Sequence, residues 1–241
     1  MWTYPAKMIA HRGGGNLAPE NTIAALRCGL SHGFHAAEFD VMDAADGLVL
    51  MHDPERGRTV QGQGSIGDCT LADLAAMDAG AWFAPAFAGE PVPTFAVARD
   101  FCLAHGIWMN AEIKPVPGTE AATGRQVALA CAALPAGSVL LSSFAVDALL
   151  AARDAAPTVP RALLVEAVPD DWVEQLQQVG AVALHAKAAL LTPIRAAAVK
   201  AAGYGLLCYT VNDPAQAREL FAMGVDAICT DRLDLIGPGF A

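Results

Sequence analysis

The alternation of apolar and polar positions over the last two thirds of the chain predicts a repeating order of strands and helices. Short apolar runs, which are typical of buried strands, occupy residues 107–113, 138–142, 161–165, 181–185, 205–210 and 225–229. Segments with apolar side chains at helical spacing lie around and between these runs and cover residues 94–104, 120–133, 145–155, 170–179, 193–202 and 213–223. Strands that alternate with helices in this way form parallel sheets.

Two further strands are predicted in the first third of the chain, at residues 8–11 and 36–42. Between them, residues 19–32 have helical spacing, Asn21 or Thr22 is a suitable helix cap, and Gly33 ends the segment. Another apolar run at residues 48–52 follows Asp46-Gly47, a pair that favours a tight hairpin turn. With this hairpin partner excluded, the pattern gives about eight strand–helix steps, which predicts a TIM (β/α)₈ barrel.

Residues 54–93 interrupt the alternation. The segment contains many Gly and Pro residues, one weak helical pattern at residues 71–77, and the aromatic residues Trp82, Phe83 and Phe87. We interpret it as a small lobe inserted after the second barrel strand and lying over the site, without a core of its own. All 241 residues are then expected to form one domain that includes this lobe.

Composition favours a cytoplasmic protein with a large core. The hydrophobic fraction is 54%, yet no long uninterrupted apolar stretch predicts a membrane span. The N-terminus lacks the charged and apolar regions of a secretory signal. The six cysteines include no C-x-x-C pair and mostly have apolar neighbours, which indicates buried, reduced thiols rather than disulfides or a zinc site.

The formal net charge of −10 excludes several classes of partner. It argues against a nucleic-acid surface and against stable association with anionic membranes. The partners expected are therefore small molecules, and a homodimer is an assembly that the composition allows. An anionic substrate would require local positive charge at its binding site.

Polar residues gather at the carboxyl ends of the predicted strands, where a barrel keeps its chemistry. Glu38 and Asp40 are two residues apart on one strand, so their side chains share a face, and so do those of Glu112 and Lys114. Two carboxylates that point together repel each other unless a cation or a proton lies between them. An all-carboxylate set of Glu38, Asp40 and Glu112 suits Mg²⁺, Ca²⁺ or Mn²⁺.

The order of short motifs along the chain resembles that of the glycerophosphodiester phosphodiesterases. The matching motifs are His11-Arg12-Gly13, Pro19-Glu20-Asn21-Thr22, Glu38-x-Asp40, His52-Asp53, Glu112-Ile113-Lys114, Leu141-Ser142-Ser143-Phe144, Tyr209-Thr210-Val211-Asn212 and Thr230-Asp231-Arg232. The likeness runs from Ala10 to the end of the chain and includes bacterial members associated with glycerol-3-phosphate uptake. It implies metal-dependent hydrolysis of glycerophosphodiesters to sn-glycerol 3-phosphate and an alcohol.

The resemblance also implies roles for particular residues. His11 and His52 would be the general acid and base, because histidine titrates in the range needed for both proton transfers. The divalent cation would be held by Glu38, Asp40 and Glu112. The residues expected to bind substrate are Arg12, Lys114, Tyr209, Phe144 and His185. From their adjacency to motif residues alone, Glu20 and Asp53 are expected to orient the catalytic side chains. Tyr209 stands where the family commonly has tryptophan.

Several alternatives stay open at this stage. The nucleophile is either the glycerol 2-hydroxyl, which gives a cyclic phosphate that water then opens, or a water molecule that the cation activates. A phospholipase on the same barrel would need an apolar rim, for which the aromatic residues of the lobe are candidates. Lys114 could instead form a Schiff base, as in an aldolase. A non-catalytic phosphodiester-binding protein is disfavoured because every expected catalytic position is filled.

Overall fold

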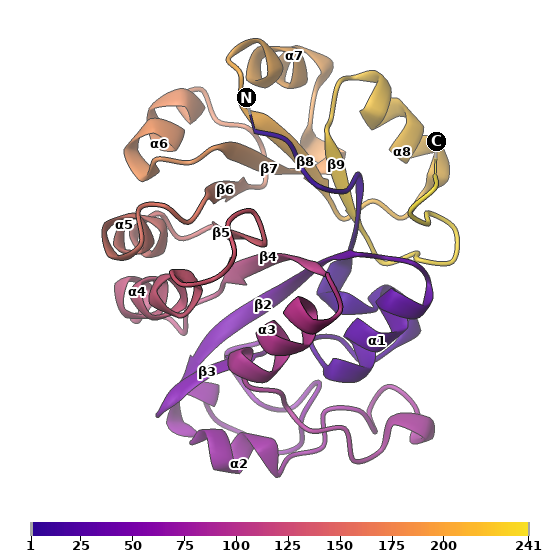
Figure 1. The fold of residues 1–241 in the computed structure, drawn as a ribbon, viewed down its shortest axis with the longest axis vertical. Coiled ribbons are helices and arrows are strands. Elements are labelled where there is room, and N and C mark those ends of the chain that lie inside the picture. Colours follow the sequence, from indigo (N-terminus) through magenta and orange to yellow (C-terminus); the bar gives the residue numbers. More distant parts are fainter. Residues whose placement is uncertain (1, 241) are drawn as a thin grey trace.

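A computed structural model describes residues 2–240 and contains a closed barrel of eight parallel strands (Figure 1). The barrel closes because β1 pairs with both β2 and β9. Its strands are β1 (Met8–Ala10), β2 (Ala36–Ala44), β4 (Trp108–Ile113), β5 (Val139–Ser143), β6 (Arg161–Val165), β7 (Ala183–Lys187), β8 (Gly205–Tyr209) and β9 (Ala227–Thr230). The predicted TIM barrel is therefore confirmed.

Helices surround the barrel and cover its strands (Figure 1). They are α1 (Ile23–Ser31), α3 (Phe95–Ala104), α4 (Glu120–Cys131), α5 (Val146–Ala155), α6 (Trp172–Val179), α7 (Pro193–Ala201) and α8 (Pro214–Ala222). Two clusters of buried apolar side chains join these helices to the outer faces of the strands. Up to residue 240, no helix follows β9, and none of the described helices is long and apolar enough to cross a membrane.

A third apolar cluster fills the amino-terminal end of the barrel interior. Its members come from all eight barrel strands and from the segment before β1, and include Ile9, Trp108, Leu140 and Leu207. The ring of Tyr4 is buried against Trp108 with the ring centroids 6.1 Å apart. This end of the barrel is therefore packed, whereas the polar strand residues lie toward the carboxyl ends.

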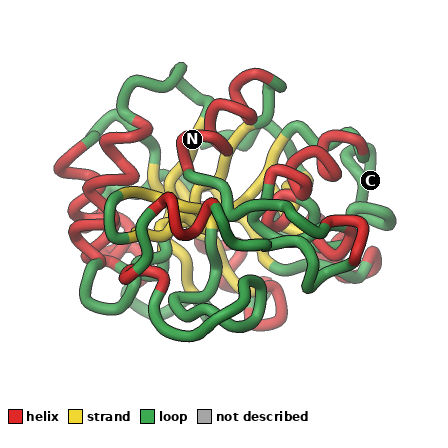
Figure 2. Tube along the Cα trace, turned by 90° about the horizontal axis from the view of Figure 1, so that it is seen from below, coloured by secondary structure: helices red, strands yellow, loops and turns green. Residues whose placement is uncertain are grey.

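Strand β3 (Gly47–Leu50) pairs antiparallel with β2, as the hairpin signal predicts, and leads into the inserted lobe of residues 54–93. The lobe is mostly irregular and includes the short helix α2 (Leu71–Ala75) (Figure 2). Its buried side chains, among them Val60, Ile66 and Leu74, share one cluster with Met42 of β2 and Val49 of β3. The lobe is thus anchored on the hairpin.

The helix predicted at residues 19–32 begins at Ile23, four residues later than expected. Thr22 is its cap and accepts a hydrogen bond from the Ala25 backbone amide. Asn21 instead adopts a left-handed conformation, with φ of 58°, and its side chain bonds Asp40. The sequence signal for the cap is correct, but the residues before it serve the site rather than the helix.

Candidate active site

His11 lies on a tight turn just after β1. Its Nδ1 is 2.6 Å from Oδ1 of Asp231, and its Nε2 is 3.8 Å from Oε2 of Glu38. Burial lowers the pKa of His11, but the hydrogen bond to Asp231 and the charge of Glu38 outweigh this, so its pKa is raised. Gly15 has a φ of 53°, and a Cβ there would lie 2.3 Å from the Asp231 carbonyl oxygen. The glycine run thus allows the loop to approach Asp231.

Three carboxylates meet at the mouth of the barrel. Oxygens of Glu38, Asp40 and Glu112 lie within 4.8 Å of one another. Glu38 and Asp40 are buried on β2, and Glu112 pairs with Asp40 across the strands. Burial and the charge of Asp40 raise the pKa of both Glu38 and Glu112. The shared face predicted from the two-residue spacing is therefore present, and the set could hold one divalent cation.

Two cationic side chains border these carboxylates. Lys114 Nζ lies 3.2 Å from Asp40 and 3.9 Å from Glu112, and Arg12 Nε lies 3.6 Å from Asp40. The Arg12 backbone amide also donates to Glu38. Burial alone would raise the pKa of Asp40, but Lys114 and Arg12 outweigh it, so the pKa is lowered. The pKa values of the three carboxylates are thus shifted in different directions: that of Asp40 is lowered, and those of Glu38 and Glu112 are raised.

His52 follows β3 and carries its own carboxylate partner. Its Nδ1 is 2.6 Å from Oδ1 of Asp53. Burial, together with the charges of Arg12 and Lys114, lowers its pKa, although Asp40 and Asp53 act in the opposite direction. Each candidate catalytic histidine thus has one ring nitrogen at hydrogen-bond distance from an aspartate, which leaves the other nitrogen free for chemistry.

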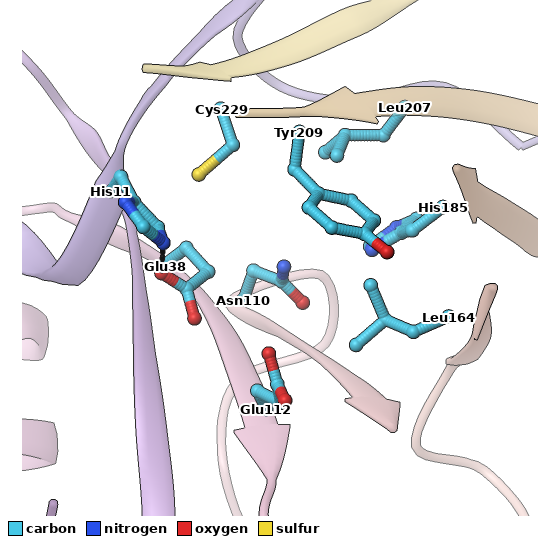
Figure 3. A pocket seen from close by; sticks show the side chains of 9 residues that line it. All are labelled: His11, Glu38, Asn110, Glu112, Leu164, His185, Leu207, Tyr209 and Cys229. Atoms are coloured by element: carbon cyan, nitrogen blue, oxygen red, sulfur yellow. Dashed lines mark ion pairs between the residues drawn. The ribbon is translucent and has the colours of Figure 1, made fainter. Parts of the chain in front are cut away.

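A cavity of about 30 Å³ continues from the carboxylates into the barrel (Figure 3). Its wall is formed by His11, Glu38, Asn110, Glu112, Leu164, His185, Leu207, Tyr209 and Cys229. The buried Oδ1 of Asn110 and Nδ1 of His185 have no hydrogen-bond partner among the described residues. A volume of this size can hold one or two water molecules.

The three other residues predicted to bind substrate lie in or beside this cavity. His185 is fully buried, its Nε2 is 3.0 Å from the Tyr4 hydroxyl, and burial lowers its pKa to about 3. Tyr209 donates its hydroxyl to the Val165 carbonyl. Phe144 is 48% exposed and packs edge-on against Tyr209 with centroids 5.9 Å apart. His185 is therefore deep, whereas Tyr209 and Phe144 are nearer the surface.

Sequence reasoning misses several polar residues that hold the site together. Asp231 belongs to a matching motif but has no role assigned from the sequence, although it lies against His11. Asn212 donates to the second oxygen of Asp231, and Asn110 lines the cavity. Glu20 is not among these missed residues, because the sequence predicts it to orient catalytic side chains; it accepts a hydrogen bond from Arg12 at 2.6 Å. The position of Asp231 just after the last predicted strand is the signal that could have identified it.

Comparison with known proteins gives one consistent result. The model of the glycerophosphoryl diester phosphodiesterase family matches residues 11–235. A glycerophosphodiester phosphodiesterase of Caldanaerobacter subterraneus subsp. tengcongensis is 32% identical over 93% of both chains, and YhdW of Bacillus subtilis is 31% identical over 95% of this chain and 96% of YhdW.

A similar solved structure is that of a phosphodiesterase from Oleispira antarctica in complex with its product sn-glycerol 3-phosphate. It has a TM-score of 0.87 and 35% identity, and the match covers 93% of this chain and 92% of that one. Both the sequence and the barrel therefore match over nearly their whole length. This chain belongs to the glycerophosphoryl diester phosphodiesterase family.

Proposed function

We propose that this enzyme hydrolyses glycerophosphodiesters to sn-glycerol 3-phosphate and an alcohol, with His11 and His52 as its acid–base pair. The observation that carries the proposal is the convergence of three carboxylates, two cationic side chains and two aspartate-bound histidines at one barrel mouth. The product bound in the Oleispira antarctica structure supports the identity of the product.

The carboxylate set fits a divalent cation. Glu38, Asp40 and Glu112 offer only oxygen ligands, and burial together with the charge of Asp40 raises the pKa values of Glu38 and Glu112. A bound cation would offset the repulsion among the three carboxylates. Mg²⁺, Mn²⁺ and Ca²⁺ all suit such ligands. When bound, the cation would stabilise negative charge on the phosphoryl oxygens during the reaction.

Arg12 and Lys114 are proposed to bind the phosphodiester anion. Both lie beside Asp40, where they offset the negative charge of the carboxylates. The planar guanidinium of Arg12 suits two parallel hydrogen bonds to phosphate oxygens, whereas Lys114 provides a compact charge. In a protein with net charge −10, these side chains supply the local attraction that the substrate needs.

His11 and His52 are proposed to move the two protons of the reaction. One histidine accepts the proton of the attacking hydroxyl group, which belongs either to the glycerol 2-position or to water. As the new P–O bond forms, the P–O bond to the leaving alcohol breaks, and the other histidine gives its proton to the alcohol oxygen. If the 2-hydroxyl attacks, the product of this step is a cyclic phosphate. Water then opens it by breaking the P–O bond to the glycerol 2-oxygen, with the two histidines in exchanged roles. Asp231 and Asp53 hold the Nδ1 atoms and leave the Nε2 atoms available for these transfers.

The glycerol half of the substrate is proposed to contact Tyr209, Phe144 and His185. Tyr209 and His185 both line the cavity (Figure 3). Phe144 packs edge-on against Tyr209. The leaving alcohol has no such set of polar groups assigned to it. We therefore expect specificity to reside in the glycerol phosphate half.

The test is turnover of glycerophosphocholine, followed with a coupled glycerol-3-phosphate dehydrogenase assay. His11→Ala and His52→Ala should each lower kcat by about 10²–10⁴, with smaller effects on binding. The double variant should lose little beyond the worse single variant, because the two residues act as one unit. Absence of turnover by the parent protein with Mg²⁺, Mn²⁺ or Ca²⁺ present would contradict the proposed function.

The leaving group distinguishes the two histidines. A p-nitrophenyl ester of glycerol phosphate needs no proton for its leaving group, so it should restore activity to the variant that lacks the acid and not to the variant that lacks the base. If neither variant responds to the leaving group, histidine does not protonate the alcohol, and Lys114 becomes the better candidate.

A further inference from the structure

Arg58 of the inserted lobe contacts the carboxylates that lie behind two proposed functional residues. Its Nε donates to Oδ2 of Asp53 at 2.6 Å. Its Nη1 and Nη2 donate to the two oxygens of Glu20 at 2.6 and 2.7 Å. Glu20 also accepts from Arg12, and Asp53 is at hydrogen-bond distance from His52. One guanidinium thus joins the Glu20–Arg12 pair to the Asp53–His52 pair, which lies far from it in the sequence.

We propose that Arg58 is a positioning residue that fixes Glu20 and Asp53, and through them sets the Arg12 guanidinium and the His52 imidazole for the substrate. The inference rests on the proposed functions of Arg12 and His52. It assigns to the lobe a direct part in the site. Arg58 itself is placed behind the carboxylates and has no assigned contact with substrate.

Arg58 acts on His52 through Asp53. Asp53 uses one oxygen for Arg58 and the other for His52, so the carboxylate is held from both sides. Asp53 is partly exposed, and without Arg58 its side chain would be free to turn toward water. His52 would then lose the partner that fixes its ring orientation and its tautomer. The charged groups that act on His52, besides Asp53, are Asp40, Arg12 and Lys114.

Arg58 also affects the charge at the phosphate site, through Glu20 and Arg12. Oε1 of Glu20 is shared by Nη1 of Arg12 and Nη2 of Arg58, and Oε2 binds Arg58 alone. With Asp53, which Arg58 also binds, the two guanidiniums and two carboxylates have a net charge of zero. Without Arg58, the remaining Arg12, Glu20 and Asp53 would have a net charge of −1, and the attraction for an anionic substrate would fall.

Substitution of Arg58 should leave the lobe folded. The Arg58 side chain is 45% exposed, whereas its neighbours Thr59 and Val60 are buried. The local turn is closed by a backbone hydrogen bond from Gly57 to Val60 that needs no side chain. Arg56 provides a matched control, because it lies in the same turn but bonds the Gln63 carbonyl within the lobe.

The experiment compares Arg58→Gln, Arg58→Lys and Arg58→Ala with Arg56→Gln and with Arg12→Gln. Steady-state kinetics give kcat and KM, and competitive inhibition by inorganic phosphate gives anion affinity. Nitrogen-15 NMR of the imidazole reports the His52 tautomer. These readouts separate a positioning role from a loss of folded protein, which would lower the amount of active enzyme without changing KM or the inhibition constant.

We expect Arg58→Gln to weaken phosphate inhibition about five- to tenfold and to raise KM by a similar factor. It should also mix the His52 tautomers and lower kcat. Arg58→Lys should retain part of the anion affinity, methylguanidinium should partly restore Arg58→Ala, and Arg56→Gln should behave like the parent.

One combination of results would overturn the inference. If phosphate inhibition and the His52 tautomer are unchanged in Arg58→Gln while Arg12→Gln weakens the inhibition, Arg58 does not position the site, and the proposed function stands. Failure of the parent to release glycerol 3-phosphate would instead refute the proposed function itself.

Discussion

Asp231→Asn is the substitution that tests most directly how His11 is held. The change keeps the size of the side chain and removes its charge. In the parent, Oδ1 of Asp231 lies 2.6 Å from His11 Nδ1, and Oδ2 accepts from Asn212 at 2.9 Å. The introduced amide can satisfy only one of these neighbours, because its nitrogen would meet a donor at the other.

Asn212 is not free to rotate and relieve this conflict. Its Oδ1 already accepts from the Asp231 backbone amide at 2.8 Å, and a flipped amide would lose that bond. If the new amide nitrogen faces His11, the imidazole must present an unprotonated Nδ1 and carry its proton on Nε2. The nitrogen that faces the reaction would then be unable to accept a proton.

The expected loss follows from two contributions. A hydrogen bond to a charged group contributes about 1.5–3 kcal/mol, which corresponds to about 10–150-fold in rate. A wrong tautomer can by itself reduce turnover by up to about 10⁴. We therefore expect kcat to fall by about 10²–10³, while KM changes little because Asp231 is not placed against the phosphate.

The assay is the coupled measurement of glycerol 3-phosphate release, with nitrogen-15 NMR to read the His11 tautomer. Asp234→Asn is the control, because Asp234 is partly exposed and pairs with Arg232 at the surface. Retention of kcat within about threefold in Asp231→Asn, with a His11 tautomer like that of the parent, would refute the reasoning.

Three further predictions follow from the site. EDTA should abolish activity, and Mg²⁺, Mn²⁺ or Ca²⁺ should restore it, whereas full activity of metal-stripped Glu38→Ala would contradict the cation site. Glycerophosphocholine, glycerophosphoethanolamine and glycerophosphoglycerol should all be cleaved, and a preference above about a thousandfold (about 4 kcal/mol) would oppose the assignment of specificity. Burial alone would raise the pKa of Asp53, but hydrogen bonds from Arg58 and His52 outweigh burial and lower this pKa to about 2. Ionised Asp53 therefore stabilises the fold above about pH 4, and this stabilisation is lost as the pH falls toward 2. Urea unfolding should show Asp53→Asn about 1 kcal/mol less stable at pH 6 and equal to the parent near pH 2, a magnitude reduced for solvent exposure.

The regular part of the fold could be predicted because its sequence is periodic. Apolar runs and helical spacing located the barrel strands and helices, with boundaries shifted by a few residues. The period of two placed Glu38 beside Asp40 on one face, and the strand-end rule brought Glu112 to them. Those inferences need only the geometry of a strand and of a parallel barrel.

The partners of these residues could not be predicted in the same way, because they come from irregular segments. Asp231 meets His11 across 220 positions, and Arg58 reaches Glu20 across 38. Arg12 and Asn21 have φ values of 50° and 58°, which no helical or strand period anticipates. A periodic pattern of residues predicts structure only where the same backbone conformation repeats from residue to residue.

The acids lie on strands and their partners on loops for a physical reason that concerns charge. Bringing Glu38, Asp40 and Glu112 together at a buried barrel mouth is unfavourable, and the two strands that carry them contain no Lys or Arg, because Lys114 follows the last residue of β4. Loops can approach from outside the barrel and place a guanidinium or an amide wherever the carboxylates require one. The strands therefore determine which acids meet, and the loops determine which of them stay ionised and how the histidines are oriented. Substitutions in the loops should accordingly alter affinity and pH dependence while the barrel remains intact.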